Sequence, residues 1–283
     1  MPASVLIVEL RAHGLDDMKI NIDGLSVEYV MRRSGEKLTA LKDVSFSIAA
    51  GRFVCVVGPS GCGKSTLLKV LAGLQAPSAG KVLLDDMPLQ GPGKNRAMVF
   101  QSASLLPWRT VLRNVTYGLE IQGFSFQDAE KVAGDFIDLV GLSGFEESYP
   151  REISGGMQQR VNLARALVTN PGLLLMDEPF ANLDPQLRNF MQAEVERIWE
   201  QTRQTTLFVT HLIDEAIFLA DEIIVLTARP GRIKTIVPVD FPRPRKLEIK
   251  KTPAFHVLQD SLSEMMDQEF REMIYQQAQG ESA

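Results

Sequence analysis

The stretch GPSGCGKST, residues 58–66, combines spaced glycines with a lysine and hydroxyl side chains. It follows RFVCVV, a continuous apolar run typical of a buried parallel strand, and leads into STLLKVLAG, which predicts a helix ending at Gly73. Glycines between a strand and a helix let backbone N–H groups turn inward around a polyphosphate, and the helix adds the positive end of its dipole. We therefore expect a phosphate-binding loop, with Lys64 reaching the β- and γ-phosphates and Ser65 ligating Mg²⁺.

Length and composition limit what else the chain can be. Its 283 residues, 45% hydrophobic and 23% charged, are enough for a folded globular core. The net charge of −5 provides no general basic field for nucleic acid or for an anionic membrane. No apolar run approaches the roughly 18 residues of a membrane span, and the first residues lack a signal-peptide pattern, so we expect a cytosolic chain. Cys55 and Cys62, the two cysteines, are too few for a structural zinc site.

Strands and helices are expected to alternate along most of the chain. The segments INIDGLSVEYV and LKDVSFSI alternate apolar and polar residues, which predicts antiparallel strands with one solvated face. Residues 102–165 show helical spacing instead, with Thr110 and Ser125 as candidate N-caps. Further strands are predicted at KVLLD, AMVF, GLLLM, TTLFVT and EIIVLT. This order predicts an α/β fold with a mostly parallel sheet core, an antiparallel β subdomain and a helical insertion, and with functional groups at the carboxyl ends of the strands.

The end of the chain has a different composition. The segment VDFPRPRKLEIKKTP contains prolines that exclude regular helix and charges that indicate a surface-running linker. Beyond it, apolar residues recur at helical spacing, which predicts a helix packed on its own domain or a partner, with a regulatory role as the alternative: Phe255, Leu258, Leu262, Met265, Met266, Phe270 and Met273. We therefore divide the chain into an extension of unknown role (1–17), a main domain (18–240) and a linker with an amphipathic helix (241–283).

A second motif, LLLMDEP at residues 173–179, predicts a buried strand that ends in two carboxylates. Asp177 at the strand tip is suited to the shell of a Mg²⁺ ion, and Glu178 to orienting or deprotonating an attacking water. A phosphate loop alone does not choose between a kinase, a GTPase and an ATPase, and this pair narrows the choice. His211 after LFVT and Gln101 after MVF are single polar residues at strand ends, which by themselves are most often plain end groups.

Taken together, these motifs resemble those of the nucleotide-binding domain of ABC transporters, over roughly residues 20–240. GPSGCGKST resembles the Walker A loop and LLLMDEP the Walker B strand, while Gln101 matches the Q-loop, Asp184 within NLD the D-loop, and His211 the switch histidine. The resemblance implies ATP and Mg²⁺ as cofactors and a set of ATP-binding residues, which are Tyr29, Gly58, Pro59, Ser60, Gly61, Cys62, Gly63, Lys64, Ser65 and Thr66. It also implies Glu178, His211 and Gln101 as catalytic residues and Ser65, Gln101 and Asp177 as metal ligands.

The stretch ISGGMQQR, residues 153–160, matches the family signature, with Ile153 and Met157 departing from its commonest form. In the family two domains pair head to tail, and the signature of one closes over the ATP of the other. The resemblance therefore implies a homodimer in which four signature residues act on the partner's ATP: Ser154, Gly155, Gly156 and Gln158. The helix that begins there adds its positive dipole end to the γ-phosphate.

Several features are similar to the ATPase subunits of nitrate, sulfonate and taurine importers: LLPW, GGMQQR, DEPFANLD and RPGRI with its proline-rich tail. This resemblance implies transmembrane permease partners, an indirect solute-binding protein, no nucleic acid, and a peripheral place on the cytoplasmic side of the membrane. The apolar LLPW segment is a candidate contact with the permease, although packing within the helical insertion explains it equally well. The alternatives are a soluble ABC ATPase acting on nucleic acid or ribosomes, and a nucleotide-gated binding module without turnover.

Overall fold

The computed structural model describes residues 18–31 and 35–280. The predicted extension 1–17 lies outside the described residues. The described chain forms two compact units, one of residues 94–204 and one of residues 18–93 with 205–280. Within the residues described, no helix is both long enough and apolar enough to cross a membrane.

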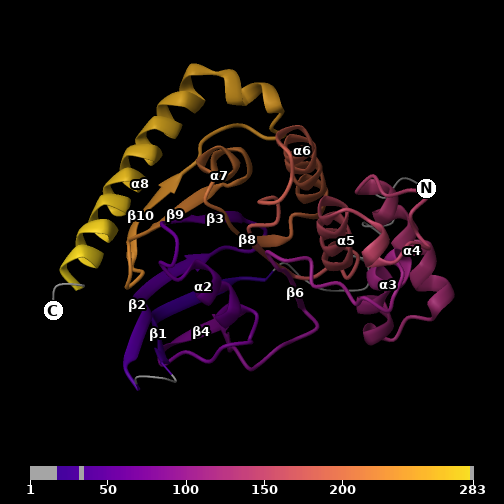
Figure 1. Cartoon of the computed structure of the whole chain (residues 1–283), viewed down its shortest axis with the longest axis horizontal. Helices are drawn as coiled ribbons and strands as arrows, with labels where there is room; N and C mark the ends of the chain where they lie inside the picture. The colour runs from indigo at the N-terminus through magenta and orange to yellow at the C-terminus, as the bar shows by residue number, and fades with distance from the viewer. Residues whose placement is uncertain (1–17, 32–34, 281–283) are drawn as a thin grey trace. The chain divides into compact units, whose positions relative to one another are not determined.

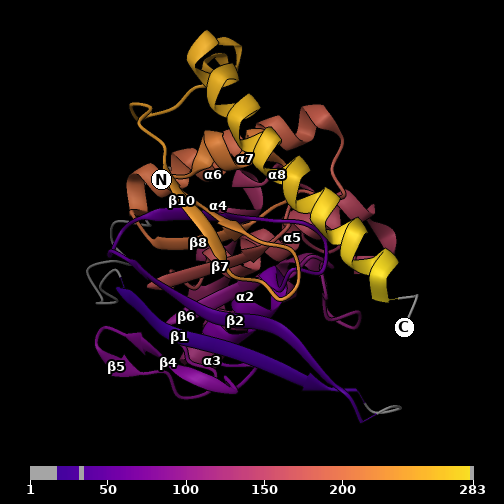
Figure 2. The same ribbon diagram turned by 90° about the vertical axis from the view of Figure 1, so that its left-hand side faces the viewer.

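An antiparallel sheet opens the second of these units. It contains β1 (Ile20–Val30), β2 (Lys37–Ile48), β4 (Ala79–Leu84) and the short β5 (Met87–Pro88), in the order β2-β1-β4-β5. Figure 2 shows β1 and β2 running side by side, as their antiparallel register requires. Alternate residues of β1 are buried, including Ile20 and Ile22, while Asn21 is exposed. The alternation in the sequence therefore correctly predicted β1 and β2 as antiparallel strands, while β5 was not predicted.

The same unit contains a parallel sheet that carries the phosphate loop. Its strand order is β10-β9-β3-β8, where β3 spans Phe53–Val57, β8 Thr205–Val209, β9 Glu222–Leu226 and β10 Ile233–Pro238. Strand β3 is parallel to both β8 and β9, whereas β10 runs antiparallel to β9. All five residues of β3 are buried, as its unbroken apolar sequence predicts. Helices α2 (Lys64–Leu71) and α7 (Ile213–Leu219) follow β3 and β8.

The tail of the second unit consists of the short 3-10 helix η2 (Leu247–Lys251) and the long helix α8 (Pro253–Gly280). Figure 1 shows α8, in yellow, running past β9 and β10. The prediction that the charged segment before α8 runs over the surface is wrong for Arg245, which is only 5% exposed. Its guanidinium donates to carbonyls at the end of α7, among them Ile217 and Ala220. Each of these hydrogen bonds from the charged guanidinium satisfies a carbonyl at the end of α7, so Arg245 holds the segment before α8 against the core.

The other unit, residues 94–204, combines two parallel strands with the helical region. Strands β6 (Arg96–Val99) and β7 (Leu173–Asp177) pair in parallel. Four helices and a 3-10 turn complete the unit: α3 (Val111–Gln122), α4 (Phe126–Leu139), η1 (Pro150–Glu152), α5 (Gly155–Leu167) and α6 (Pro185–Thr202). The side chains of Thr110 and Ser125 accept hydrogen bonds from backbone N–H groups of α3 and α4, so both are N-caps as predicted.

Candidate functional site

The phosphate loop joins β3 to α2 and closes around its own lysine. Lys64 is the first residue of α2 and only 6% exposed. Its Nζ donates to the carbonyl oxygens of Gly58 at 2.6 Å and Pro59 at 3.1 Å. Gly61 and Gly63 adopt φ angles of +77° and +106°, which residues other than glycine rarely adopt. The glycine spacing of the motif thus sets a backbone path that folds back over the ammonium group.

Two more of the predicted residues lie in the same unit. The hydroxyl of Tyr29 on β1 is 3.2 Å from Oγ1 of Thr66, so this aromatic ring lies near the start of α2. His211 follows β8, whose residue Val209 pairs with Val56 of β3. Since β3 and β8 are parallel neighbours, the phosphate loop and His211 leave the sheet at the same edge.

Both cysteines of this unit are buried free thiols. Cys62 lies within the phosphate loop and is 1% exposed, and burial raises the pKa of its thiol. A Cβ at Gly58 would lie 2.7 Å from its Sγ, so the thiol packs against the first glycine of the loop. Burial likewise raises the pKa of Cys55 on β3. Both thiols are therefore held in the neutral form and fill space in the core.

In residues 94–204 the structure brings Gln101 and Glu178 together. Asp177 is the last residue of β7 and is 7% exposed, and Glu178 follows with a φ of +45°, which is rare for a residue other than glycine. The amide nitrogen of Gln101 donates to Oε2 of Glu178 at 3.2 Å. Uncommon backbone conformations of this kind are frequent at functional sites, which agrees with the predicted role of Glu178.

Helix α5 holds the segment around Gln101, a role that sequence reasoning missed. The side-chain amides of Gln159 and Asn162 both donate to the carbonyl oxygen of Phe100, each at 3.1 Å. Arg165 donates to the carbonyl oxygens of Ala103 and Ser104 at 3.1 and 3.2 Å, and burial lowers the pKa of its guanidinium. The available signal was the spacing of three polar residues, 159, 162 and 165, which places them on one face of the helix.

The signature residues begin α5. Ser154 is the N-cap, and its Oγ accepts a hydrogen bond from the N–H of Met157 at 3.3 Å. The amide nitrogen of Gln158 donates to Pro150 O at 2.9 Å, so this side chain supports the preceding turn. Asp184, predicted in the D-loop, caps α6 in the same way by accepting from the N–H groups of residues 186 and 187.

All three of the predicted Mg²⁺ ligands offer an oxygen atom. Ser65 contributes a hydroxyl, Asp177 a carboxylate and Gln101 an amide oxygen, and hard oxygen ligands are those that Mg²⁺ prefers. The side-chain nitrogen of Gln101 donates the hydrogen bond to Glu178, so the amide oxygen of Gln101 is not used in that bond. The chemistry of these three residues therefore fits the ion.

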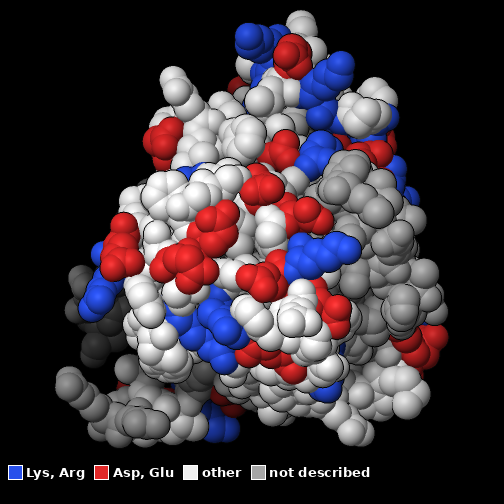
Figure 3. Space-filling model, turned by 90° about the vertical axis from the view of Figure 1, so that its right-hand side faces the viewer, with Lys and Arg blue, Asp and Glu red and all other residues white. Residues whose placement is uncertain are grey.

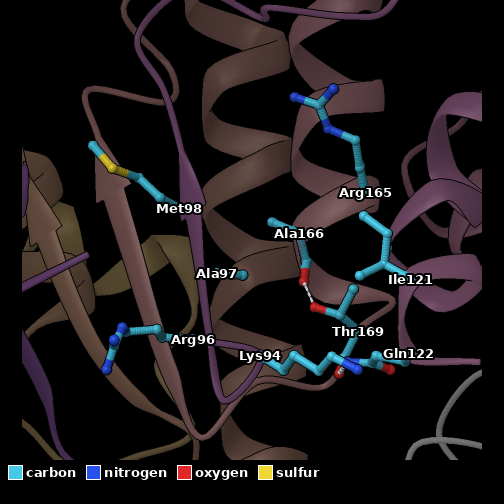
Figure 4. A pocket seen from close by; sticks show the side chains of 10 residues that line it. Lys94, Arg96, Ala97, Met98, Ile121, Gln122, Arg165, Ala166 and Thr169 are labelled. Atoms are coloured by element: carbon cyan, nitrogen blue, oxygen red, sulfur yellow. Dashed lines mark hydrogen bonds between the residues drawn. The ribbon is translucent and has the colours of Figure 1, made fainter. Parts of the chain in front are cut away.

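A cavity of about 200 Å³ lies in the same unit as α5, between β6, α3 and α5. Figure 4 shows Lys94 extending toward Gln122 and Thr169, whose hydroxyl donates to Ala166 O. Arg165 also lines the cavity, but its guanidinium points away from it, consistent with its bonds to the segment after Gln101. We assign this cavity no part in nucleotide binding.

The chain has a glycine-rich loop that surrounds a lysine and joins a strand to a helix. It also has carboxylates at the end of a second parallel strand. These features define a phosphate-loop nucleoside triphosphatase. A family model described as ABC transporter matches residues 41–181. An uncharacterized ABC transporter ATP-binding protein of Methanocaldococcus jannaschii is 50% identical over 230 residues, which cover 81% of this chain and 86% of that protein. The chain therefore belongs to the ABC transporter ATP-binding family, and it is an ATPase of that family.

Other relatives have more specific names. The nitrate import ATP-binding protein NrtD of Synechocystis is 42% identical over 88% of this chain and 95% of its own length. The taurine import ATP-binding protein TauB of Yersinia pestis is 45% identical over 78% of this chain and 85% of its own length. Among solved structures, a dimeric ATP-binding cassette in a post-hydrolysis state, bound to ADP and Pi, has a TM-score of 0.72 and 30% identity, covering 79% of this chain and all of that one. These matches confirm the predicted fold class.

Proposed function

We propose that this chain is the ATP-hydrolysing subunit of an importer for a small anion such as nitrate, an alkanesulfonate or taurine. The observation that carries the proposal is the match to the nitrate importer subunit, which extends over 95% of that protein. The match to a taurine importer subunit has the same character. Nitrate is a small oxyanion and taurine is a small molecule with a sulfonate group, so the two names agree on solutes that carry a negatively charged oxygen group.

Within this function, each predicted residue has a chemical task. Lys64 and the loop N–H groups bind the polyphosphate, and Tyr29 stacks on the adenine. Glu178 orients or deprotonates the attacking water, and His211 and Gln101 complete the catalytic set. Ser65, Gln101 and Asp177 would hold a Mg²⁺ ion, which would supply positive charge next to the phosphate oxygens.

We propose further that two copies pair head to tail, so that the signature of one acts on the ATP of the other. A Cβ built at Gly155 would meet no described atom within 4 Å, and its φ is not among the positive ones. Neither packing in the described part of this chain nor backbone conformation therefore explains a glycine at that position. Close approach of another molecule's phosphate does explain it, and the solved dimer of a similar cassette supports this assembly.

The partners follow from the importer role. We place the chain on the cytoplasmic side of the membrane, bound to permease subunits that receive solute from a separate solute-binding protein. Trp108 in the LLPW segment is 71% exposed, which suits a contact with the permease. On the face of the molecule in Figure 3, acidic side chains cover more area than basic ones, which disfavours binding of a nucleic acid backbone there.

Reconstitution tests the proposal directly. The chain and its permease are placed in proteoliposomes with the solute-binding protein, and phosphate release is measured with nitrate, taurine or a methylated sugar outside. We expect nitrate or taurine to stimulate ATP hydrolysis and the sugar to have no effect. A chain that hydrolyses ATP but never binds a permease, or responds to the sugar alone, would overturn the importer role.

A further inference from the structure

The loop between β9 and β10 contacts the phosphate loop. Nε and Nη2 of Arg229 both donate to the carbonyl oxygen of Gly61, each at 3.1 Å. Gly231 approaches the next carbonyl so closely that a Cβ there would lie 2.0 Å from Cys62 O. The β9–β10 loop thus fixes the Gly61 carbonyl by hydrogen bonds and packs closely against the Cys62 carbonyl.

Fixing the Gly61 carbonyl also fixes an N–H group. In a trans peptide the C=O and the following N–H point in opposite directions, so the N–H of Cys62 must point away from Arg229. The N–H of Cys62 donates to Pro59 O at 3.3 Å, and the same carbonyl also accepts from Lys64 Nζ. The orientation of the Gly61–Cys62 peptide therefore maintains a turn whose Pro59 carbonyl also holds the lysine ammonium.

Helix α8 anchors the β9–β10 loop through one buried carboxylate. Glu269 on α8 is 2% exposed. Its Oε2 accepts from the N–H of Ala228 at 2.8 Å, and its Oε1 accepts from Nζ of Lys234 at 2.7 Å. Ala228 directly precedes Arg229, so the carboxylate holds the backbone just before the arginine. A buried carboxylate with a charged partner is a strong local restraint, because either partner left alone would be costly.

We propose that Arg229 is a positioning residue for nucleotide binding, and that Glu269 of α8 holds it in place. By fixing the Gly61–Cys62 peptide, the pair holds the turn in which Cys62 N–H donates to Pro59 O, the carbonyl that also accepts from Lys64. The phosphate loop therefore keeps its shape before the nucleotide arrives, which lowers the ordering cost of binding. The proposal rests on residues 58–66 being the ATP site. It extends that site to the tail helix, so displacement of α8 weakens nucleotide binding.

A single NMR signal reports on this peptide. The chain has two cysteines, and only Cys62 follows a glycine. Protein labelled with ¹³C-carbonyl glycine and ¹⁵N-cysteine therefore gives one selected amide resonance, that of Cys62. Titration with ADP follows this resonance and yields the dissociation constant at the same time.

The variants are Arg229→Met, Arg229→Lys and Glu269→Gln. Arg232→Met on the same loop and Glu264→Gln on α8 are matched controls, because both of those side chains are exposed. We expect Arg229→Met to shift the Cys62 resonance without nucleotide and to weaken ADP binding about tenfold, with an unchanged melting temperature. Glu269→Gln should shift the resonance in the same direction and weaken binding about threefold, and the controls should do neither.

Arg229→Lys separates positioning from charge alone. We expect it to weaken ADP binding about threefold, because one ammonium cannot reproduce the two bonds of the guanidinium. Full affinity in Arg229→Lys together with a Cys62 resonance displaced as in Arg229→Met would assign the effect to charge and overturn the proposal. An unmoved resonance and unchanged affinity in Arg229→Met would overturn it as well. Lys64→Ala distinguishes the two proposals, since unchanged ADP binding there would reject the loop as the ATP site itself.

Discussion

At the scale of the residue, Lys64 occupies the position that defines the phosphate loop. Its ammonium is buried and is held by two carbonyl oxygens of the loop that precedes it. A phosphate oxygen is a stronger partner for an ammonium than a carbonyl is, because both groups are charged. The lysine therefore holds the loop in shape, and under the proposed function a bound nucleotide would give its ammonium a stronger partner.

Removing this ammonium should weaken ATP binding. We expect Lys64→Ala to raise the dissociation constant for ATP at least about tenfold, the loss of one charge-assisted bond. Lys69→Ala is the matched control, since Lys69 lies on the same helix and is exposed. Equilibrium titration with a fluorescent ATP analogue measures both, and equal constants for the two variants would argue against the assignment of residues 58–66.

The thiol of Cys62 gives a prediction about pH. Burial raises its pKa, so the neutral thiol is favoured in the folded protein while an unfolded chain ionises at lower pH. Only the thiolate reacts with iodoacetamide, so we expect alkylation of Cys55→Ser protein at pH 8 to be at least about tenfold slower than that of free cysteine. In urea the rate should rise to the free value. Rapid modification of the folded chain at pH 8 would contradict this.

At the scale of the element, the sequence predicted what local patterns determine. The strand before the phosphate loop and the caps Thr110 and Ser125 follow from short stretches of chain. Strand β10 was missed, because its residues are half exposed at a sheet edge and end in Pro238, so no clear period shows. The contact of Arg229 with Gly61 joins residues 168 positions apart, and no local pattern encodes such a pairing.

The glycines that follow two helices allow the cost of a strained backbone conformation to be distinguished from the cost of a steric collision. Gly73 follows α2 with a φ of +76°, and a Cβ there would lie 1.9 Å from the backbone oxygen of Gly91. Gly123 ends α3 with a φ of +101°, and its Cβ would meet no described atom within 4 Å. We expect Gly123→Ala to cost about 1 kcal/mol and to lower the melting temperature by about 3 °C. Gly73→Ala should lower it by at least about 8 °C, and a similar shift in both would show that the approach to Gly91 is not tight.

At the scale of the whole molecule, the proposed mechanism needs two copies of the chain. A shared γ-phosphate links two copies only until it is hydrolysed, so a variant that binds ATP without hydrolysis should remain dimeric. We expect Glu178→Gln to bind ATP with Mg²⁺ and to elute as a dimer, because the charge that activates water is lost while the polyphosphate contacts stay. Light scattering measures the mass. A monomer with bound ATP would count against head-to-tail pairing.

The pairing itself predicts where damage appears. If Ser154 and Gly155 act on the partner's ATP, a large charged side chain in one copy should impair the site built on the other copy's Lys64. Two mixed dimers are compared. Both carry Ser154→Arg in one copy; the first carries Lys64→Ala in that same copy, and the second carries it in the other copy. Different affinity tags on the two copies allow each mixed dimer to be purified. When both substitutions lie in one copy, they should damage the same site only if the site is built within a single chain. We instead expect that dimer to lose activity at both sites, whereas the dimer with the substitutions in opposite copies keeps one intact site and about half the phosphate release. The reverse order of activities would mean that each signature acts within its own chain.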